Sequence, residues 1–416
     1  MDAHLPSSTL ASCFMFFRLC YESFDLSHRA PLTFSTFFTV FLPPVVLYYV
    51  TNVLAIVGPR TFVHRLALLP VTLFVTFRTI MSLNIASGFF PSEPGKLAHL
   101  NQTLVLAMFT VITRTLFRTF ASQIPQRRDA NTLTFKQILL EAADLTFNLR
   151  GIGWNFSASM KVPRYTRSLA PRSAFLRQTA QSLVAHLVVF DILHYICQLL
   201  SPGPVGSTAS FSIFDMTIPN PLTRQLHVLV MSSLGGLCIY GAIQFGHDAC
   251  SLIGVGLCHQ SPSEWPPIFK FPWLSTSLAD FWAVRWHQIF RQEFIAIGVK
   301  PLSLIAGRVG AVLGAFLLSG ILHYVCLWGT GNGADARVIL YFAIMGVGVL
   351  LEEMWRRLSS RRVGGWVGWV WTAVWVVGFG PLMIDPLCQS GVMGSVFIPH
   401  NVRPAVLLHR LIIKRR

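Results

Sequence analysis

The residues of this chain best suited to chemistry are two histidines, 36 positions apart, in surroundings that are otherwise apolar and aromatic. His323 ends the run Leu-Leu-Ser-Gly-Ile-Leu-His, and His287 ends the run Phe-Trp-Ala-Val-Arg-Trp-His. Desolvation keeps an imidazole neutral, and a neutral imidazole can remove a proton from a hydroxyl group. A charged side chain at membrane depth costs about 2.5 kcal/mol or more, so an ionisable residue there is a functional candidate by default.

Each histidine also has a purely structural interpretation. Small residues precede His323 at intervals of four, on one face of a helix: Gly307, Ala311, Ala315 and Ser319. Such a stripe lets a second helix approach closely, with His323 as a hydrogen-bonded packing residue, or it leaves room for a ligand. The tryptophans before His287 suit a membrane interface, so that segment is also compatible with an ordinary interfacial helix.

Further polar residues extend these two clusters. Arg285 and Arg291 could bind an anionic ligand, because a guanidinium group donates two parallel hydrogen bonds to phosphate, or they could be solvated arginines of an interfacial helix. Asp191 and His194 lie three positions apart in another apolar segment and can touch on one helix face. A structural pair is the more usual reading of such a contact.

Composition indicates a membrane protein. The chain has 416 residues, of which 53% are hydrophobic and 12% charged, and its mean hydropathy is +0.56. Soluble domains carry about 25% charged residues. The net charge of +16 comes from basic residues between apolar segments, which favours cytosolic loops over binding of nucleic acid. The eight cysteines form no C-x-x-C pair, so we expect neither a disulfide framework nor a zinc site.

Eight apolar segments are each near the ~20 residues needed to cross about 30 Å of hydrocarbon. They are Leu32–Val57, Phe62–Met81, Leu100–Phe120, Phe175–Leu200, Leu222–Phe245, Leu302–Trp328, Val338–Trp355 and Gly364–Leu387. Thr134–Leu149 has helical apolar spacing and is expected to lie along the interface, and Ala405–Ile413 is too short to cross. We therefore predict an all-α fold, with residues 1–416 forming a single polytopic membrane domain.

Three runs of residues carry a resemblance to a known family. They are Trp265-Pro-Pro-Ile-Phe269, Ser277-Leu-Ala-Asp-Phe-Trp-Ala-Val-Arg-Trp-His-Gln288 and Ser319-Gly-Ile-Leu-His323. In this order they resemble the wax-synthase-like branch of the membrane-bound O-acyltransferases, over residues 246–333. The run Arg150-Gly-Ile-Gly-Trp-Asn155 is similar to a motif of fungal members. Those members often acetylate hydroxyl groups of terpenoids and meroterpenoids.

The resemblance implies an intramembrane catalytic histidine at the position of His323, with His287 as a catalytic or oxyanion-stabilising partner. Residues that would shape or charge the entrance for the CoA substrate are Trp282, Arg285, Trp286, Arg291 and Ser319. It further implies acetyl-CoA as co-substrate, a lipophilic alcohol as acceptor, no bound cofactor or metal, and the endoplasmic reticulum membrane as location. Two positions depart from the family pattern: Ala283-Val284 replaces a frequent Gly-Arg, and Tyr324 stands where an acidic residue is common.

Two other functions remain compatible with the sequence. One keeps the fold but joins a long-chain acyl-CoA to a fatty alcohol, which would make wax esters. The other is a proton-coupled transporter with Asp191, His194 and His323 as a relay, although no paired half-repeats support it. The chain has no G-x-S-x-G, H-E-x-x-H or P-loop motif, which argues against a hydrolase, a metalloprotease or a nucleotide-driven pump.

Overall fold

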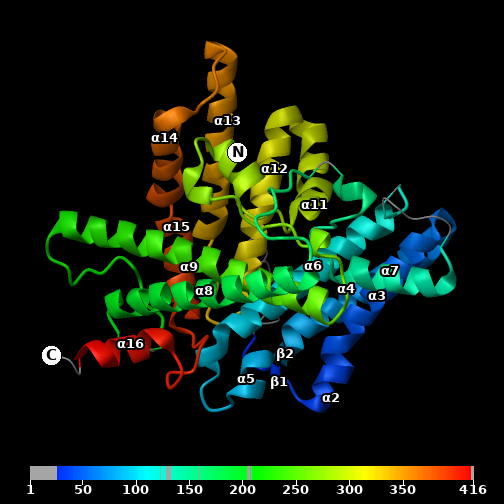
Figure 1. Cartoon of the computed structure of the whole chain (residues 1–416), viewed down its shortest axis with the longest axis horizontal. Coiled ribbons are helices and arrows are strands. Elements are labelled where there is room, and N and C mark those ends of the chain that lie inside the picture. Colours follow the sequence, from blue (N-terminus) through cyan, green and yellow to red (C-terminus); the bar gives the residue numbers. More distant parts are fainter. Residues whose placement is uncertain are drawn as a thin grey trace, which may run out of the picture.

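The computed structural model describes residues 26–413, apart from 122, 128–132, 159, 204–206 and 208. The fold is all-α, as predicted (Figure 1). The strands are two residues long: β1 (Ala30–Pro31) pairs in parallel with β2 (Leu83–Asn84). Within the described residues, eight helical stretches are long and apolar enough to cross a membrane. The chain is therefore an integral, multi-pass membrane protein.

The first third of the chain forms one bundle. Its helices are α2 (Phe34–Thr36), α3 (Leu42–Val57), α4 (Phe62–Ser82), α5 (Ile85–Phe89), α6 (Ala98–Phe120) and α7 (Phe135–Phe147). The predicted interfacial segment is indeed a helix, α7, and it begins at a capping box in which Thr134 and Gln137 bond each other's backbone N–H. It packs on α3, where the Tyr49 hydroxyl donates to the carbonyl oxygen of Leu139 over 3.1 Å.

Two long helices, α8 (Arg172–Leu200) and α9 (Pro221–Gly256), pair with each other and run across the direction of α13 (Arg337–Ser359) in Figure 1. The predicted end of α9 at Phe245 is wrong, because the helix continues for eleven residues past it. This continuation carries two polar residues, His247 and Asp248. Asp248 is nevertheless stable inside it, because Arg167 (2.5 Å) and the Ser182 hydroxyl (2.7 Å) both bond its carboxylate.

The predicted span Leu302–Trp328 is also wrong at its start. Residues 300–328 form α12 (Lys300–Trp328), but the backbone reverses at Ala306 (φ −128°, ψ 24°) and Gly307 (φ +53°). Residues 291–305, which include α11 (Arg291–Glu293) and a π-helical turn at Phe294–Val299, are the first arm of a helical hairpin. Residues 308–328 are the second arm, and the two arms lie side by side in Figure 1. Gly307 permits the turn because a positive φ is accessible to glycine.

The arms of this hairpin pack backbone against backbone. A Cβ atom at Gly310 would overlap the carbonyl oxygen of Leu302, and one at Gly314 would overlap that of Gly298. Small residues are what allow such close approach of helices in a membrane. Part of the small-residue composition seen in the sequence therefore serves helix packing, on the face that carries Gly310 and Gly314.

Gly314→Ala is accordingly expected to destabilise the protein, by about 1–3 kcal/mol for the overpacked contact. Gly378→Ala is the matched control, since a Cβ there would meet no atom within 4 Å. Thermal unfolding of the purified protein in detergent measures both. A melting temperature of Gly314→Ala equal to that of Gly378→Ala would contradict the close packing of the arms.

The remaining helices close the fold. The predicted span Gly364–Leu387 is broken into α14 (Gly365–Gly378) and α15 (Pro381–Gln389), because Pro381 lacks an N–H and starts a new helix. The last helix, α16 (Pro404–Ile413), packs on α8. Arg403 fixes it there by bonding Asp191 (2.6 Å) and His194 (3.1 Å), and the backbone N–H of Ala405 donates to Asp191 as well. Asp191 and His194 thus have a structural role.

Candidate functional site

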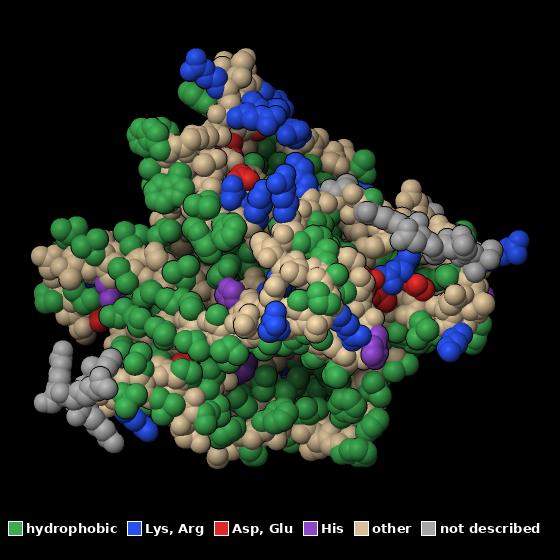
Figure 2. All heavy atoms as spheres, in the orientation of Figure 1, with side chains coloured by type: hydrophobic (Ala, Val, Ile, Leu, Met, Phe, Trp, Pro, Cys, Tyr) green, Lys and Arg blue, Asp and Glu red, His purple; other side chains and the backbone are tan. Residues whose placement is uncertain are grey.

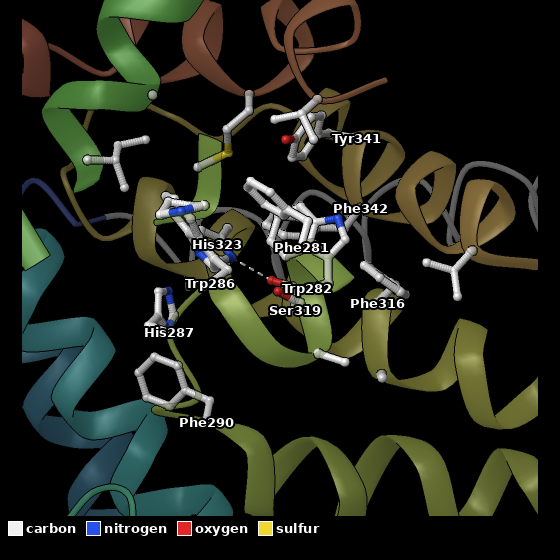
Figure 3. Close-up of a pocket in the computed structure, with 18 of the residues that line it drawn as sticks. Phe281, Trp282, Trp286, His287, Phe290, Phe316, Ser319, His323, Tyr341 and Phe342 are labelled. Atoms are coloured by element: carbon white, nitrogen blue, oxygen red, sulfur yellow. Dashed lines mark hydrogen bonds between the residues drawn. The ribbon is translucent and has the colours of Figure 1, made fainter. Parts of the chain in front are cut away.

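A cavity of about 770 Å³ lies between α9, α12, α13 and α15, and both histidines line it (Figure 3). Its walls are mostly apolar and aromatic, with Phe281, Trp282 and Phe342 around the histidines. Ligand sites in proteins are typically concave and apolar, with a small number of placed polar groups. The cavity therefore fits a lipophilic ligand whose reactive group meets the two imidazoles.

His323 projects from the second arm of the hairpin. Its Nδ1 atom lies 2.7 Å from the carbonyl oxygen of Ser319, one turn earlier on the same helix. Because a carbonyl can only accept, Nδ1 carries the proton and the lone pair is left on Nε2. Phe342 stacks on the imidazole at a centroid distance of 4.5 Å and fixes the ring plane. His323 is thus held in the tautomer of a general base.

The stripe of small residues before His323 borders this cavity. Ala311, Ala315 and Ser319 all contribute to its lining, on the same face as His323. Gly310 and Gly314 lie on the adjoining face, against the first arm. Room for a ligand is therefore the reading that fits Ala311, Ala315 and Ser319, whereas Gly307 forms the turn of the hairpin. The close helix packing comes from Gly310 and Gly314, which the predicted stripe did not include.

His287 reaches the cavity from an irregular segment. A π-helical turn, Phe281–Arg285, ends at Trp286, whose backbone is extended (ψ 151°), and His287 follows. Its Nδ1 atom is buried without a hydrogen-bond partner among the described residues. Burial, with smaller contributions from the nearby His323 and Arg150, lowers the pKa of His287 to about 3. The ring is therefore neutral at physiological pH and can donate one hydrogen bond.

A buried carboxylate holds the segment that carries His287. Glu352 on α13 accepts hydrogen bonds from the backbone N–H groups of Leu278 (2.6 Å) and Ala279 (3.0 Å), in α10 (Leu278–Asp280). The indole of Trp371 on α14 donates to the same carboxylate over 3.0 Å. A carboxylate at a helix N-terminus is favourable because the first N–H groups there lack partners. Sequence reasoning missed Glu352, although an acidic residue inside an apolar span was a signal for it.

The predicted binding residues separate into two groups. Trp282, Trp286, Arg291 and Ser319 line the cavity together with both histidines. Arg285 does not line it. Its Nε atom donates to Asp280 over 2.5 Å, and its Nη1 atom donates to the carbonyl oxygen of Lys270 over 3.1 Å. Arg285 therefore braces the adjoining loop, and this arrangement gives it no contact with a ligand in the cavity.

The motif around Arg150 packs against the run Trp265–Phe269, which is the first of the three family-like runs. Arg150 donates to the carbonyl oxygens of Pro266 and Pro267, each at 3.1 Å. Burial lowers the pKa of Arg150 to about 10, so the side chain remains cationic at neutral pH. The two glycines of the motif both have positive φ, +62° at Gly151 and +87° at Gly153, which explains why glycine is needed there.

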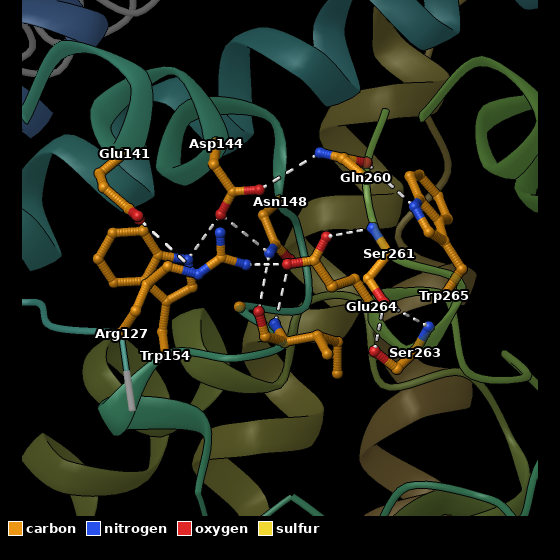
Figure 4. A network of polar contacts seen from close by, with 12 residues as sticks. Arg127, Glu141, Asp144, Asn148, Trp154, Gln260, Ser261, Ser263, Glu264 and Trp265 are labelled. Carbon is orange, nitrogen blue, oxygen red and sulfur yellow. Dashed lines mark hydrogen bonds and ion pairs between the residues drawn. The ribbon is translucent and has the colours of Figure 1, made fainter. Parts of the chain in front are cut away.

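A polar network extends this contact (Figure 4). The indole of Trp154 donates to Asp144 on α7 over 2.8 Å, and Gln260 donates to the other oxygen of the same carboxylate. Arg127 forms an ion pair with Glu264. The network therefore ties α7 and the 148–156 loop to residues 260–267, which lead into the segment that carries His287.

A buried ion pair fixes the start of the first arm. Arg114 on α6 binds Glu293 through Nε and also donates to the carbonyl oxygens of Asn148 (3.3 Å) and Leu149. The two charged side chains are 5% and 3% exposed. Glu293 lies six residues after His287, so the pair fixes the chain to α6 close to that histidine.

Comparisons with known proteins agree with the motifs. Residues 265–345 match the membrane bound O-acyl transferase family, a range that includes both cavity histidines. The acetyltransferase spyB of Aspergillus fumigatus is 26% identical over 60% of this chain and 48% of its own length. The O-mevalon transferase yanI of Aspergillus niger is 24% identical over 64% of this chain and 66% of its own length. The acetyltransferase eriL of Hericium erinaceus is 22% identical over 68% of this chain and 75% of its own length.

The resemblance that the sequence motifs indicated is confirmed by these matches. The aligned part of the chain spans about half of the Aspergillus fumigatus relative and about two thirds of the Aspergillus niger one.

Proposed function

Because residues 265–345 resemble the membrane-bound O-acyltransferases, we propose that this protein transfers an acetyl group from acetyl-CoA to a hydroxyl group of a lipophilic secondary metabolite, a terpenoid or meroterpenoid. The observation that carries the proposal is that the imidazoles of His287 and His323 line the same, mostly apolar cavity. Two of the relatives described above are named acetyltransferases, which supports the acetyl donor.

The geometry provides a general base. Nε2 of His323 takes the proton of the acceptor hydroxyl as its oxygen attacks the thioester carbonyl carbon. The tetrahedral intermediate then expels the CoA thiolate, which receives the proton from His323. A thiolate is a good leaving group, so no covalent acyl-enzyme is needed. General base catalysis of this kind contributes about 10²–10⁴ in rate.

His287 is the candidate for stabilising the oxyanion. Its buried ring nitrogen without a partner can donate to the negative oxygen that develops on the thioester carbonyl. His287→Ala is expected to lower kcat by about 10²-fold, the usual loss for one oxyanion donor, with KM for acetyl-CoA little changed. Steady-state kinetics of the purified variant measure the two constants, and a rise in KM at constant kcat would assign His287 to substrate binding instead.

The acceptor is expected to arrive from the bilayer. At one end the cavity is lined by Leu237 on α9 and by Met383 and Ile384 on α15, all apolar. Leu237 is 41% exposed and lies on one of the helices that are apolar enough to cross a membrane. An alcohol that partitions into the endoplasmic reticulum membrane could enter there without crossing water.

The test supplies microsomes that contain the protein with acetyl-CoA or palmitoyl-CoA, a panel of terpenoid alcohols and a fatty alcohol. CoA release together with an acetyl ester of one terpenoid alcohol, identified by mass spectrometry, would establish the proposal. Esterification with palmitoyl-CoA and the fatty alcohol alone would replace it with wax synthesis. A proton relay has less support, because Asp191 and His194 do not line the cavity and are bonded to Arg403.

A further inference from the structure

The cavity extends along the second arm of the hairpin, away from the histidines. Arg308, Ala311, Ala315, Ser319 and His323 line it on successive turns of this arm, together with the larger side chains of Val312 and Phe316. The fifteen residue-to-residue steps from Arg308 to His323 correspond to roughly 22 Å of α-helix. The alanines leave a trough between a cationic end and the catalytic end.

The cationic end carries more positive charge than its carboxylate can neutralise. Arg308, Arg356 and Arg357 all bond one carboxylate, that of Glu353, at 3.2, 2.7 and 3.2 Å. All three guanidinium groups are substantially exposed, Arg308 at 62%. Figure 2 shows Lys and Arg side chains gathered over this end of the molecule, where α12 and α13 project. Guanidinium groups of this kind bind phosphate well.

The two ends of the cavity therefore differ in chemistry. The part lined by α9 and α15 has no charged residue, whereas Arg308 brings a largely exposed guanidinium group to the start of the second arm. We propose that Arg308, with Arg356 and Arg357, holds the phosphate groups of acetyl-CoA, and that the trough over Ala311 and Ala315 holds the pantetheine arm. This inference rests on the proposed function and names the part of the site that receives the donor.

The dimensions agree with this assignment. The pantetheine arm contains two amide units and, extended at the dimensions of a peptide chain, spans about 17 Å. The helix rise of roughly 22 Å between Arg308 and His323 is long enough for the extended arm. A phosphate at Arg308 thus sets the thioester beside the base. Arg285, which the sequence suggested for this role, is turned away.

The experiment compares two probes on purified protein in phosphatidylcholine nanodiscs. CoA carries the phosphates, whereas pantetheine has the same arm without them. Arg308→Gln is expected to weaken CoA binding about tenfold, which corresponds to ~1.4 kcal/mol, and to leave pantetheine binding unchanged. Ala311→Leu fills the trough and is expected to weaken both probes. Arg362→Gln removes an exposed charge beyond the end of α13 and is the control, with no expected effect on either probe.

Four results decide the matter. A selective loss of CoA affinity in Arg308→Gln, with a matching rise in KM for acetyl-CoA but not for S-acetyl-pantetheine, supports the inference. Equal losses for both probes, or unchanged CoA affinity beside normal transfer, would overturn it and leave the proposed function standing. Anionic phospholipid that stabilises the wild type through Arg308, without any effect of the variant on CoA, would assign the arginines to lipid headgroups. Folded wild-type protein that binds no CoA would refute the acetyl-CoA reaction as well.

Discussion

His323→Ala is expected to abolish measurable acetyl transfer, with a fall in rate of about 10²–10⁴-fold from loss of the general base alone. The reason is geometric: the bond from Nδ1 to the Ser319 carbonyl leaves Nε2 as the acceptor at the cavity surface, and alanine supplies no replacement. The fold should survive, since the change removes a side chain that borders a cavity. Transfer assays in microsomes, with the ester quantified by mass spectrometry, measure the effect.

The matched control is His227→Ala. His227 lies on α9 and does not line the cavity, so its removal should leave the rate within about twofold of wild type, as expected for a residue away from the site. Equal melting temperatures of the two variants would show that loss of rate is not loss of fold. Wild-type turnover by His323→Ala would refute the mechanism, and CoA binding that disappears together with transfer would point to a binding role.

Glu293→Ala is expected to be the most destabilising single substitution around the site, by about 3–5 kcal/mol. It leaves the buried guanidinium of Arg114 without its carboxylate, among residues that exclude water. Thermal unfolding of the detergent-purified protein is the measurement. Retention of wild-type stability would mean that water or lipid solvates Arg114 and that the pair is not isolated.

A double substitution sharpens this test. Arg114→Leu with Glu293→Leu removes both charges and should recover much of the loss, because a buried ion pair is often replaceable by apolar side chains. Glu93→Gln serves as the comparison, since Glu93 is 53% exposed and its ion pair with Lys96 lies at the surface. An exposed pair of this kind contributes about 0–1 kcal/mol.

Hydropathy predicted most helices of this fold but not their interruptions. The segments that became the helical stretch Phe34–Val57, α4 and α6 were placed within a few residues, because long apolar runs identify helices that cross a membrane. The reversal at Gly307 was invisible to the same criterion, since apolar residues continue on both sides of the turn. The break at Pro381 was missed for a similar reason. A hydropathy window averages over the few residues at which a chain changes direction.

For the site, the sequence identified the aromatic and histidine residues that line the cavity but not the groups that hold or extend it. His287, Trp282 and Trp286 stood out because polar and aromatic side chains are unusual in such apolar surroundings. Glu352 and Arg308 did not, because their importance depends on contacts made across the fold, to Leu278 and to Glu353. Arg285 was predicted to bind the CoA substrate because of its charge, but that charge is paired with Asp280 in the fold.

The hairpin also determines how His287 and His323 are positioned relative to each other. Its arms are matched residue by residue: Leu302 lies against Gly310, and Gly298 against Gly314, so each step of four on one arm corresponds to four on the other. The first arm begins at Arg291, four residues after His287, and the second arm carries His323, so the hairpin connects the two imidazoles. The separation of 36 residues is therefore a length set by the fold. Removing one turn from a single arm would shift the imidazoles apart by about 5.4 Å, whereas equal deletions in both arms would preserve their alignment.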